Sequence, residues 1–195
     1  MLNILLLGPQ GSGKGTQAKH LAAQHDLPHI ATGDMLRDAM AAGTPLGLQI
    51  KPVYESGGLV DDETMIALIR ERLAQPDAQD GFVLDGFPRT LAQSEALDEM
   101  LAAIGRPLDI VLFFDLPDDV ATERMLGRAA AEGRTDDTPD AIAKRLALYH
   151  QQTEPVVEHY RVTGKLVGLH AAGSVGQVQA EIDAALSVLH AEEPL

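Results

Sequence analysis

Five short apolar runs recur along the chain, and longer stretches with helical spacing separate them. The runs lie at residues 2–7, about 29–31, 82–85, 110–114 and about 165–169. They are nearly continuous in Val, Ile, Leu and Phe, which is typical of strands in a parallel sheet that is buried on both faces. The pattern therefore predicts a five-stranded parallel sheet.

The intervening stretches predict helices. Apolar residues recur at helical spacing in segments 16–24, 64–73, 91–104 and 175–189, and a further helix is expected to begin at Thr138-Pro139. The pairs Asp61-Asp62 and Thr138-Pro139 are typical helix starts, because a side-chain oxygen accepts from free N–H groups of the first turn and proline suits the first helical position. This alternation predicts an α/β fold in which helices flank the sheet.

Two segments interrupt the alternation. Residues 32–60 are rich in glycine and proline and are too long for a simple connection between elements. Residues 127–137 form a short segment that is charged and rich in alanine and glycine. We predict that both are inserts able to move, and that residues 1–31, 61–126 and 138–195 make up the core domain.

Composition narrows the class of protein. The chain has 195 residues, 45% of them apolar, which suffices for one compact core. It contains no cysteine, so disulfides and cysteine zinc sites are excluded and a reducing cytoplasm is expected. The first residues lack a basic flank, and no run approaches the roughly 20 apolar residues of a membrane span. The formal net charge of −14 disfavours a nucleic-acid partner, and we expect a monomer without a membrane partner.

A glycine-rich loop follows the first predicted strand. Residues 8–14 read GPQGSGK, which matches the G-x-x-x-x-G-K pattern of a phosphate-binding loop. Glycine lets backbone N–H groups approach a phosphate chain, the following helix presents its positive end, and Lys14 adds a charge for the outer phosphates. Gly15 stands between the lysine and Thr16, where the strict pattern has Ser or Thr directly after the lysine. The loop predicts a nucleoside triphosphate ligand, but GTPases, motors, ATPases and kinases all share it.

A second signal comes at residues 82–89, which read FVLDGFPR. Asp85 ends an apolar strand at the edge where open α/β sheets bind ligands, and an acid at this place helps to hold Mg²⁺ in proteins with a phosphate-binding loop. Arg89 follows a rigid Gly86-Phe87-Pro88 turn, and a simple surface arginine would not need so fixed a base.

Four stretches together resemble the adenylate kinase family in its short-lid form. They are GPQGSGKGTQ, TGDMLR, GFVLDGFPRT with Gln93 close behind, and GRTDD before a long helix, and the likeness covers essentially the whole chain in order. The resemblance implies a P-loop NTPase-like sheet of five parallel strands, with a monophosphate-binding insert at residues 32–60 and a short lid at residues 127–137. It implies reversible transfer of the terminal phosphoryl group of ATP to AMP, giving two ADP, with Mg²⁺ arriving on ATP.

The resemblance also assigns site residues. The implied ATP-binding residues are Gly11, Ser12, Gly13, Lys14, Gly15, Thr16, Arg124, Arg128 and Gly173. The implied AMP-binding residues are Thr32, Gly33, Arg37, Gly58, Leu59, Val60, Gly86, Phe87, Pro88, Arg89, Gln93, Arg134 and Arg145. Lys14, Arg89, Arg128, Arg134 and Arg145 are the implied catalytic residues, and Asp85 is expected to reach Mg²⁺ through water. Thr32 and Gln93 are the residues expected to contact adenine.

The distribution of cations supports this interpretation independently. Seven of the 15 basic residues, namely Lys14, Arg37, Arg89, Arg124, Arg128, Arg134 and Arg145, fall in the implied site. When about half of the cations of a strongly acidic chain gather in one cleft, the cleft is typical of a binding site for polyanions. Asp136 and Asp137 could ligate a metal in isolation, but we expect them to pair with arginines across the closed lid. No structural zinc is expected, since the lid is short and lacks cysteine.

Other nucleotide-binding proteins share parts of this pattern. Pyrimidine-specific UMP/CMP kinases in this class carry a small residue at the position of Thr32 and Asn at that of Thr90, so both positions favour AMP here. A GTPase-like switch needs an Asn-Lys-x-Asp segment, which the sequence lacks. A nucleotide-binding module that has lost catalysis would be expected to lose lid arginines, and Arg128, Arg134 and Arg145 are all present.

Overall fold

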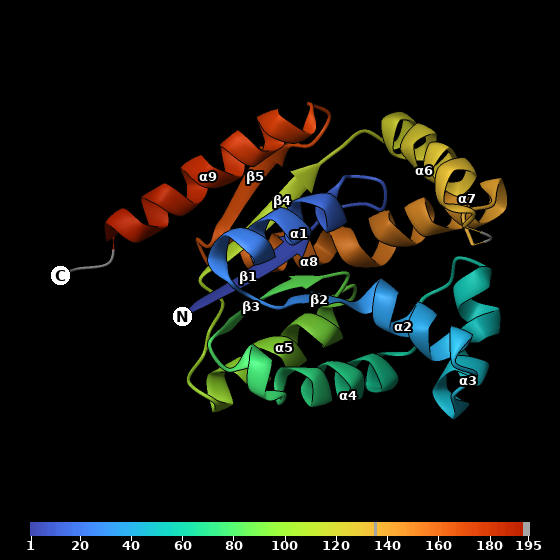
Figure 1. Ribbon diagram of the computed structural model, residues 1–195, viewed down its shortest axis with the longest axis horizontal. Coiled ribbons are helices and arrows are strands. Elements are labelled where there is room, and N and C mark those ends of the chain that lie inside the picture. The colour runs from blue at the N-terminus through green and yellow to red at the C-terminus, as the bar shows by residue number, and fades with distance from the viewer. Residues whose placement is uncertain (135, 193–195) are drawn as a thin grey trace.

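The computed structural model describes residues 1–134 and 136–192, with side chains as far as residue 189. Its strands form one parallel sheet in the order β2-β3-β1-β4-β5 (Figure 1). The strands are β1 (Leu2–Leu7), β2 (His29–Ala31), β3 (Gly81–Asp85), β4 (Ile110–Asp115) and β5 (Leu166–His170). The five predicted strands are therefore confirmed, and each bound falls within one residue of its expected place.

Helices connect the strands. They are α1 (Lys14–His25), α2 (Thr32–Ala41), α3 (Pro45–Glu55), α4 (Asp62–Leu73), α5 (Leu91–Ala103), α6 (Asp118–Glu132), α7 (Pro139–Leu148), α8 (Glu154–Arg161) and α9 (Val175–Glu192). A 3₁₀ turn, η1 (Pro76–Ala78), precedes β3, and a π-helical turn, η2 (Tyr149–Thr153), joins α7 to α8. The predicted starts are confirmed: the Asp61 carboxylate accepts from the N–H of Thr64 at 2.9 Å, and the Thr138 hydroxyl from that of Ala141 at 3.2 Å.

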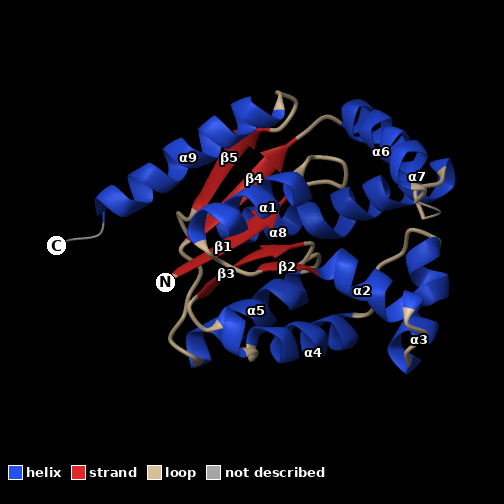
Figure 2. Cartoon of the chain, in the orientation of Figure 1, coloured by secondary structure: helices blue, strands red, loops and turns tan. Residues whose placement is uncertain are grey.

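The sheet is covered on both faces, as the apolar runs predict (Figure 2). Successive side chains of a strand point to opposite faces, so β1 contributes to two separate cores. Leu5 and Leu7 pack in a cluster with buried residues of α4, α5 and α8. Ile4 and Leu6 pack in a second cluster with buried residues of α1 and α9. Burial at about 25 cal/mol per Å² of apolar surface makes these two layers the main stabilising feature of the fold.

The two predicted inserts contain helices. Residues 32–60 hold α2 and α3, and the Thr44 hydroxyl caps α3 by accepting from the N–H of Gly47. Residues 127–132 of the predicted lid continue α6, a helix that the sequence analysis does not assign, and Gly133 ends it with a φ of 64°. Thr135 of the predicted lid, and residues 193–195 of the predicted core, lie outside the described residues.

The topology determines where the site lies. β1 has β3 on one side and β4 on the other, so the connections that follow β1 and β3 lead to different sides of the sheet and leave a crevice at the carboxyl ends of the strands. Leu6 of β1 pairs with Asp85 of β3, which puts the loop after β1 beside the end of β3. Figure 1 shows α2–α3 and α6–α7 on either side of this edge of the sheet. Within the described chain, no helix is long and apolar enough to cross a membrane.

Candidate functional site

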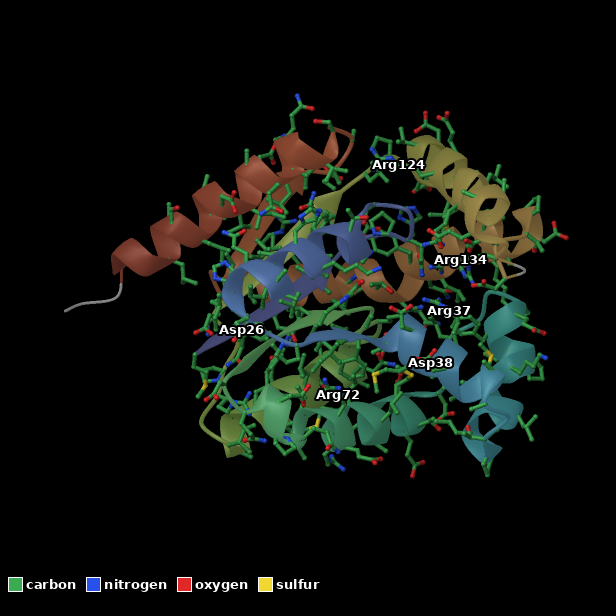
Figure 3. The ribbon with its side chains drawn as sticks, in the orientation of Figure 1. Asp26, Arg37, Asp38, Arg72, Arg124 and Arg134 are labelled. Atoms are coloured by element: carbon green, nitrogen blue, oxygen red, sulfur yellow. The ribbon has the colours of Figure 1, made fainter. Side chains whose placement is uncertain are left out.

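A cavity of about 420 Å³ opens at this edge of the sheet, and seven predicted cations line it. They are Lys14, Arg37, Arg89, Arg124, Arg128, Arg134 and Arg145. They come from the first residue of α1, the turn after β3, and helices α2, α6 and α7 with the loop between the last two. Figure 3 shows Arg37 on α2 and Arg134 near the end of α6 on opposite sides of this space. The expected convergence of basic residues on one cleft is thus confirmed.

The glycine loop lines one end of the cavity and has the backbone that the motif requires. Gly11 and Gly13 adopt φ values of 82° and 89°, a region that side chains other than glycine rarely occupy. A Cβ on Gly11 would also lie 2.7 Å from the carbonyl oxygen of Ala121 in α6, so the loop packs directly against that helix. Gly13 is the N-cap of α1, which places the positive end of the helix at the cavity.

Lys14 is folded back over the loop. Its Nζ donates to the carbonyl oxygens of Gly8 and Pro9, both at 2.8 Å, and to the Ser12 hydroxyl at 3.3 Å. Burial lowers the pKa of Lys14 to about 8; the Asp85 carboxylate opposes this effect, whereas Arg89 adds to it. Carbonyl oxygens are weaker partners for an ammonium group than phosphate oxygens, so a bound phosphate can replace them as the partner of Lys14.

Asp85 lies beside this loop at the end of β3. Burial opposes ionisation of its carboxyl, but His29 and Lys14 together hold its pKa below the usual value. The His29 Nε2 lies 3.8 Å from the carboxylate, too far for a hydrogen bond, so its effect is electrostatic. Asp85 and the Thr16 hydroxyl both line the cavity and are hard oxygen donors. This donor set fits Mg²⁺, which is bound by one or two carboxylates and completes its ligands with phosphate and water.

The described residues contain no group of three or more His, Asp or Glu side chains arranged to hold a metal. A dedicated metal cage is therefore not part of this portion of the protein. A magnesium ion that arrives with phosphate ligands needs no such cage.

Three hydrogen bonds fix Arg89, the last residue of the Gly-Phe-Pro-Arg turn. Its Nε donates to the carbonyl oxygen of Gly86 at 2.7 Å, its backbone N–H to the Gln93 Oε1 at 2.8 Å, and its carbonyl oxygen accepts from the Thr153 hydroxyl at 2.9 Å. Thr153 belongs to the π-helical turn η2, so this turn helps to position the arginine. Burial lowers the pKa of Arg89, and the nearby Arg145 and Arg37 act in the same direction.

The insert side of the cavity presents Arg37 together with two partners. Its Nη1 donates to the Tyr54 hydroxyl at 2.6 Å, and its Nη2 pairs with the Asp34 carboxylate one turn earlier on α2. Gly33 leaves room for this arrangement, because a Cβ there would lie 3.3 Å from the Arg37 Nη1.

The lid side contains a buried ion network. Asp137, whose side chain is 0% exposed, accepts from Arg128 at 2.9 Å and 2.7 Å and also pairs with Arg145. Asp136 accepts from Arg145 at 2.8 Å. The expected pairing of the two aspartates with arginines is confirmed. Arg134 donates to Glu132 at 2.7 Å, at the end of α6.

Arg124 spans from α6 to the loop after β5. Its guanidinium donates to the carbonyl oxygens of Ala171 and Ala172 at 2.9 Å and 3.2 Å. Gly173, the next residue, is not among the residues that line the cavity. The structure thus brings Arg124 to the loop that contains Gly173, and an ATP contact there stays a prediction.

Most predicted residues line the cavity and some lie behind it. Besides the seven cations, the lining includes Gly11, Gly13, Gly15, Thr16, Gly33, Gly58, Asp85, Gly86, Phe87 and Pro88. Ser12, Thr32, Leu59, Val60, Gln93 and Gly173 do not belong to it. Their assignment as nucleotide contacts stays a prediction.

The two residues expected to contact adenine are both engaged by the protein. Thr32 is fully buried, and its hydroxyl donates to the backbone oxygen of Asp85 at 3.3 Å. Gln93 donates from Nε2 to Asp62 at 2.8 Å, while its Oε1 accepts from Arg89. Asp62 also accepts from the Thr90 hydroxyl at 2.9 Å, so the amide of Gln93 has a fixed orientation.

Sequence reasoning missed several lining residues, among them Tyr54, His29, Asp34, Tyr149 and Thr153. Four of these five lie outside the motifs quoted above, and Asp34 lies within TGDMLR, where the resemblance assigns roles only to its neighbours. Tyr54 is one of only three tyrosines in the chain and lies in the glycine-rich insert, but nothing local shows that it faces Arg37. Only the folded chain brings these side chains to the cavity.

Comparison with known proteins adds independent information. The family model for adenylate kinase matches residues 6–165, which include the glycine loop and both predicted inserts. The adenylate kinase of Stenotrophomonas maltophilia (strain K279a) is 47% identical over 185 residues, covering 95% of this chain and 99% of that protein. The adenylate kinases of Xanthomonas axonopodis pv. citri (strain 306) and Xylella fastidiosa (strain 9a5c) are each 48% identical with the same coverage.

Proposed function

This chain belongs to the adenylate kinase family, and we propose that it transfers the terminal phosphoryl group of ATP reversibly to AMP, giving two ADP. One observation carries the proposal: a continuous series of cations crosses a single cavity from the glycine loop to the insert. Arg89 and Arg128 both lower the pKa of Lys14, and Arg145 and Arg37 both lower the pKa of Arg89. Each cation therefore lies within electrostatic range of the next. A site for one polyanion would not need cations at both ends.

The two ends suit two different phosphate groups. The glycine loop, Lys14 and Arg128 offer N–H donors for a triphosphate, and Arg124 extends this side toward the loop after β5. Arg37 and Arg89 offer a second anion site below α2. Arg134 and Arg145 line the cavity as well. We assign the triphosphate to the first end, the monophosphate to the second, and the phosphoryl group in transit to the space between.

In this arrangement catalysis consists of positioning and charge stabilisation. Phosphoryl transfer proceeds through a transition state whose charge is spread over the phosphoryl oxygens, and arginines that contact it contribute about 10³–10⁵ in rate in related enzymes. Two hydrogen bonds hold the backbone of Arg89, and the bond from its Nε to the Gly86 carbonyl oxygen holds the guanidinium before substrate arrives. Mg²⁺ held by Asp85 and Thr16 would neutralise charge on the phosphates when bound. We assign no general base.

Water is the competing acceptor, so the site has to close. We propose that residues 32–60 and 127–137 move over the two nucleotides and exclude it. AMP is the proposed acceptor because Thr32 and Gln93 carry groups suited to adenine and lie next to the cavity-lining Gly86 and Arg89. We also propose that the protein works in the cytoplasm, which the absence of cysteine supports, and as a monomer, which its net charge of −14 supports.

The test is ADP formation from MgATP with AMP, UMP, CMP or GMP, beside a reaction without acceptor. Fast ADP formation with AMP alone is expected. A preference for UMP or CMP would overturn the assigned base, and ATP binding without transfer to any acceptor would overturn the enzyme in favour of a nucleotide-binding module. Rapid ADP release without acceptor would indicate a hydrolase.

A matched pair of variants connects the activity to the site. Arg89→Lys keeps a positive charge but loses the fork geometry, so kcat should fall about 100-fold or more. Arg72→Lys makes the same change in the pair of Arg72 with Asp77, at the C-terminal end of α4 and outside the cavity lining, and should leave kcat unchanged. Equal kcat values for both variants would contradict the role of Arg89.

A further inference from the structure

Tyr54 occupies a central place among the arginines of the cavity. It lies on α3 and is 9% exposed, and its hydroxyl accepts a hydrogen bond from the Arg37 Nη1 at 2.6 Å. The guanidinium carbon of Arg145, on α7, lies 5.8 Å from the centre of its ring. Tyr54 thus contacts one arginine of the insert and one of the opposite side of the cavity.

The ring and the hydroxyl need separate explanations. The ring packs in the apolar cluster that includes Leu36 and Ile50, and its face meets the Arg145 cation. A phenylalanine would fill this space equally well. The hydroxyl adds nothing to that packing, yet it lies in the cavity lining beside Gly33, 3.7 Å from where a Cβ would stand.

The hydroxyl has a proton left to donate. Its oxygen accepts from Arg37, and in residues 1–134 and 136–192 no acceptor receives its own O–H. A phenol that accepts from a cation is polarised toward donation, because hydrogen bonds in a chain strengthen one another. The two side chains that contact the Tyr54 hydroxyl and ring, Arg37 and Arg145, carry guanidinium groups, which are donors only. An acceptor from outside the chain can therefore take this proton, and an anion fits.

We propose that Tyr54 is a further binding residue for the acceptor nucleotide: its hydroxyl donates to a phosphate oxygen of the monophosphate while it holds Arg37 in place to bind the same group. This inference rests on the proposed function for the identity of the acceptor. It assigns to Tyr54 a neutral donor beside the cationic donors Arg37 and Arg89. The ligand class is a phosphate monoester, and adenosine without its phosphate lies outside it.

The test compares binding of AMP and of adenosine by calorimetry, without ATP, in the wild-type protein and in Tyr54→Phe. The variant keeps the ring and its contact with Arg145 but removes the hydroxyl. Loss of a hydrogen bond to a charged group should weaken AMP binding about tenfold. Adenosine binding should stay within about twofold, because adenosine presents no phosphate. In steady-state assays the KM for AMP should rise by the same factor while the KM for ATP is unchanged.

Tyr160→Phe is the matched control. It removes a hydroxyl that donates to Asp98 at 3.2 Å, on the packed interface of α8 and α5, away from the cavity. AMP binding should be unaffected. A double variant, Tyr54→Phe with Arg37→Met, tests the coupling: because both residues hold one phosphate, the combined loss of AMP affinity should be smaller than the product of the two single losses.

Several outcomes would overturn the inference. One is AMP binding by Tyr54→Phe within about twofold of the wild type, which is below the loss expected for a hydrogen bond to a charged group. Others are equal weakening of AMP and adenosine, or losses that multiply in the double variant. A thermal melt of Tyr54→Phe that matches the wild type excludes misfolding as the cause of a loss. The two proposals fail differently: a wild type that binds AMP but makes no ADP overturns the proposed function alone, whereas a wild type that does not bind AMP overturns both.

Discussion

The carboxylate of Asp137 is predicted to stabilise the unliganded site by neutralising two arginines. Its side chain is 0% exposed and bonds Arg128 at 2.7 Å and 2.9 Å besides Arg145, whose side chain is 10% exposed. In Asp137→Asn the side chain keeps its size but loses its charge. Two guanidinium groups then lose their shared counterion, and the more buried one, that of Arg145, keeps its pair with Asp136.

The size of the effect follows from burial. Breaking a buried ion pair by removing one partner costs about 3–5 kcal/mol. The amide oxygen of asparagine still accepts one hydrogen bond and Arg128 is 28% exposed, so we expect a smaller loss than this range, about 2–3 kcal/mol. For a chain of 195 residues each kcal/mol shifts the Tm by about 2–4 °C, which gives a fall of about 4–12 °C.

Bound nucleotides should reduce this loss. Their phosphates supply negative charge to the same arginines, so the Tm difference between Asp137→Asn and the wild type should shrink when ATP and AMP are saturating. The measurement is thermal denaturation with and without nucleotides. A control is Asp77→Asn, which makes the same change in a two-bond pair with Arg72, at 2.9 Å and 2.7 Å, where the Asp77 side chain is 54% exposed. Because that pair is exposed to solvent, its loss should change the Tm little.

Two results would refute the reasoning. A Tm loss for Asp137→Asn no larger than that for Asp77→Asn would mean that burial of the network does not matter. A loss of the same size with and without nucleotides would mean that phosphates do not take over the role of the carboxylate.

Three further predictions follow from the structure. The Asp118 and Glu154 carboxylates raise the pKa of His150 above 6.5, so their contribution to stability is present below that pH and is lost as the pH rises through the pKa of the folded state. Since His150 is about half exposed, His150→Gln should lower the free energy of unfolding by less than about 1 kcal/mol at pH 6, and not at pH 9, in urea titrations; a constant difference would contradict this. Gly11→Ala should reduce kcat/KM for ATP about 10- to 100-fold, because a Cβ at a φ of 82° and close to the Ala121 oxygen strains the loop. The control Gly127→Ala adds a Cβ where α6 has open space, so it should raise the free energy of unfolding by about 0.4–1 kcal/mol in urea titrations. Equal kcat/KM values for the two variants would refute the reasoning. Burial lowers the pKa of Lys14 to about 8 and bound phosphates raise it again, so ATP binding above pH 8 should take up protons and weaken as the pH rises, measured by calorimetry in buffers of different ionisation enthalpy; zero uptake would count against it.

The sheet was predictable because its strands are buried on both faces. A continuous apolar run leaves little choice of element, and the bounds of β1 and β2 come out as the pattern predicts. The glycine loop and the turn before Arg89 were predictable for another reason. Each is a local motif whose chemistry depends on neighbours in sequence.

Helix α6 shows where the pattern misleads. Gly127 and Gly133 bracket a run rich in alanine, and the two glycines suggest a separate segment. Alanine is a strong helix former, and a single glycine inside a helix costs only about 1 kcal/mol. The helix therefore continues through Gly127, and only Gly133, with its positive φ, ends it.

The contacts of Tyr54 and Gln93 could not be predicted from sequence, because they depend on tertiary placement. Tyr54 on α3 meets Arg145 on α7, and helices α4, α5 and α6 lie between them in sequence. Gln93 looks like a base-reading amide, yet in the folded chain both of its ends are bonded, to Asp62 and to Arg89. Whether an amide is available to a ligand depends on neighbours that no linear pattern reveals.

The pairing of the site arginines bears on how a strongly acidic protein binds polyanions. Arg37 holds Asp34, Arg134 holds Glu132, and Arg128 and Arg145 share Asp137. A guanidinium has several N–H donors in a rigid fork, so an arginine bonded to a carboxylate on one edge keeps donors on another. The carboxylates therefore hold closely spaced cations together before phosphate arrives, which reduces the ordering that binding requires. On this argument phosphates join the arginines without displacing every carboxylate, and the Tyr54 hydroxyl contributes a donor that needs no counterion at all.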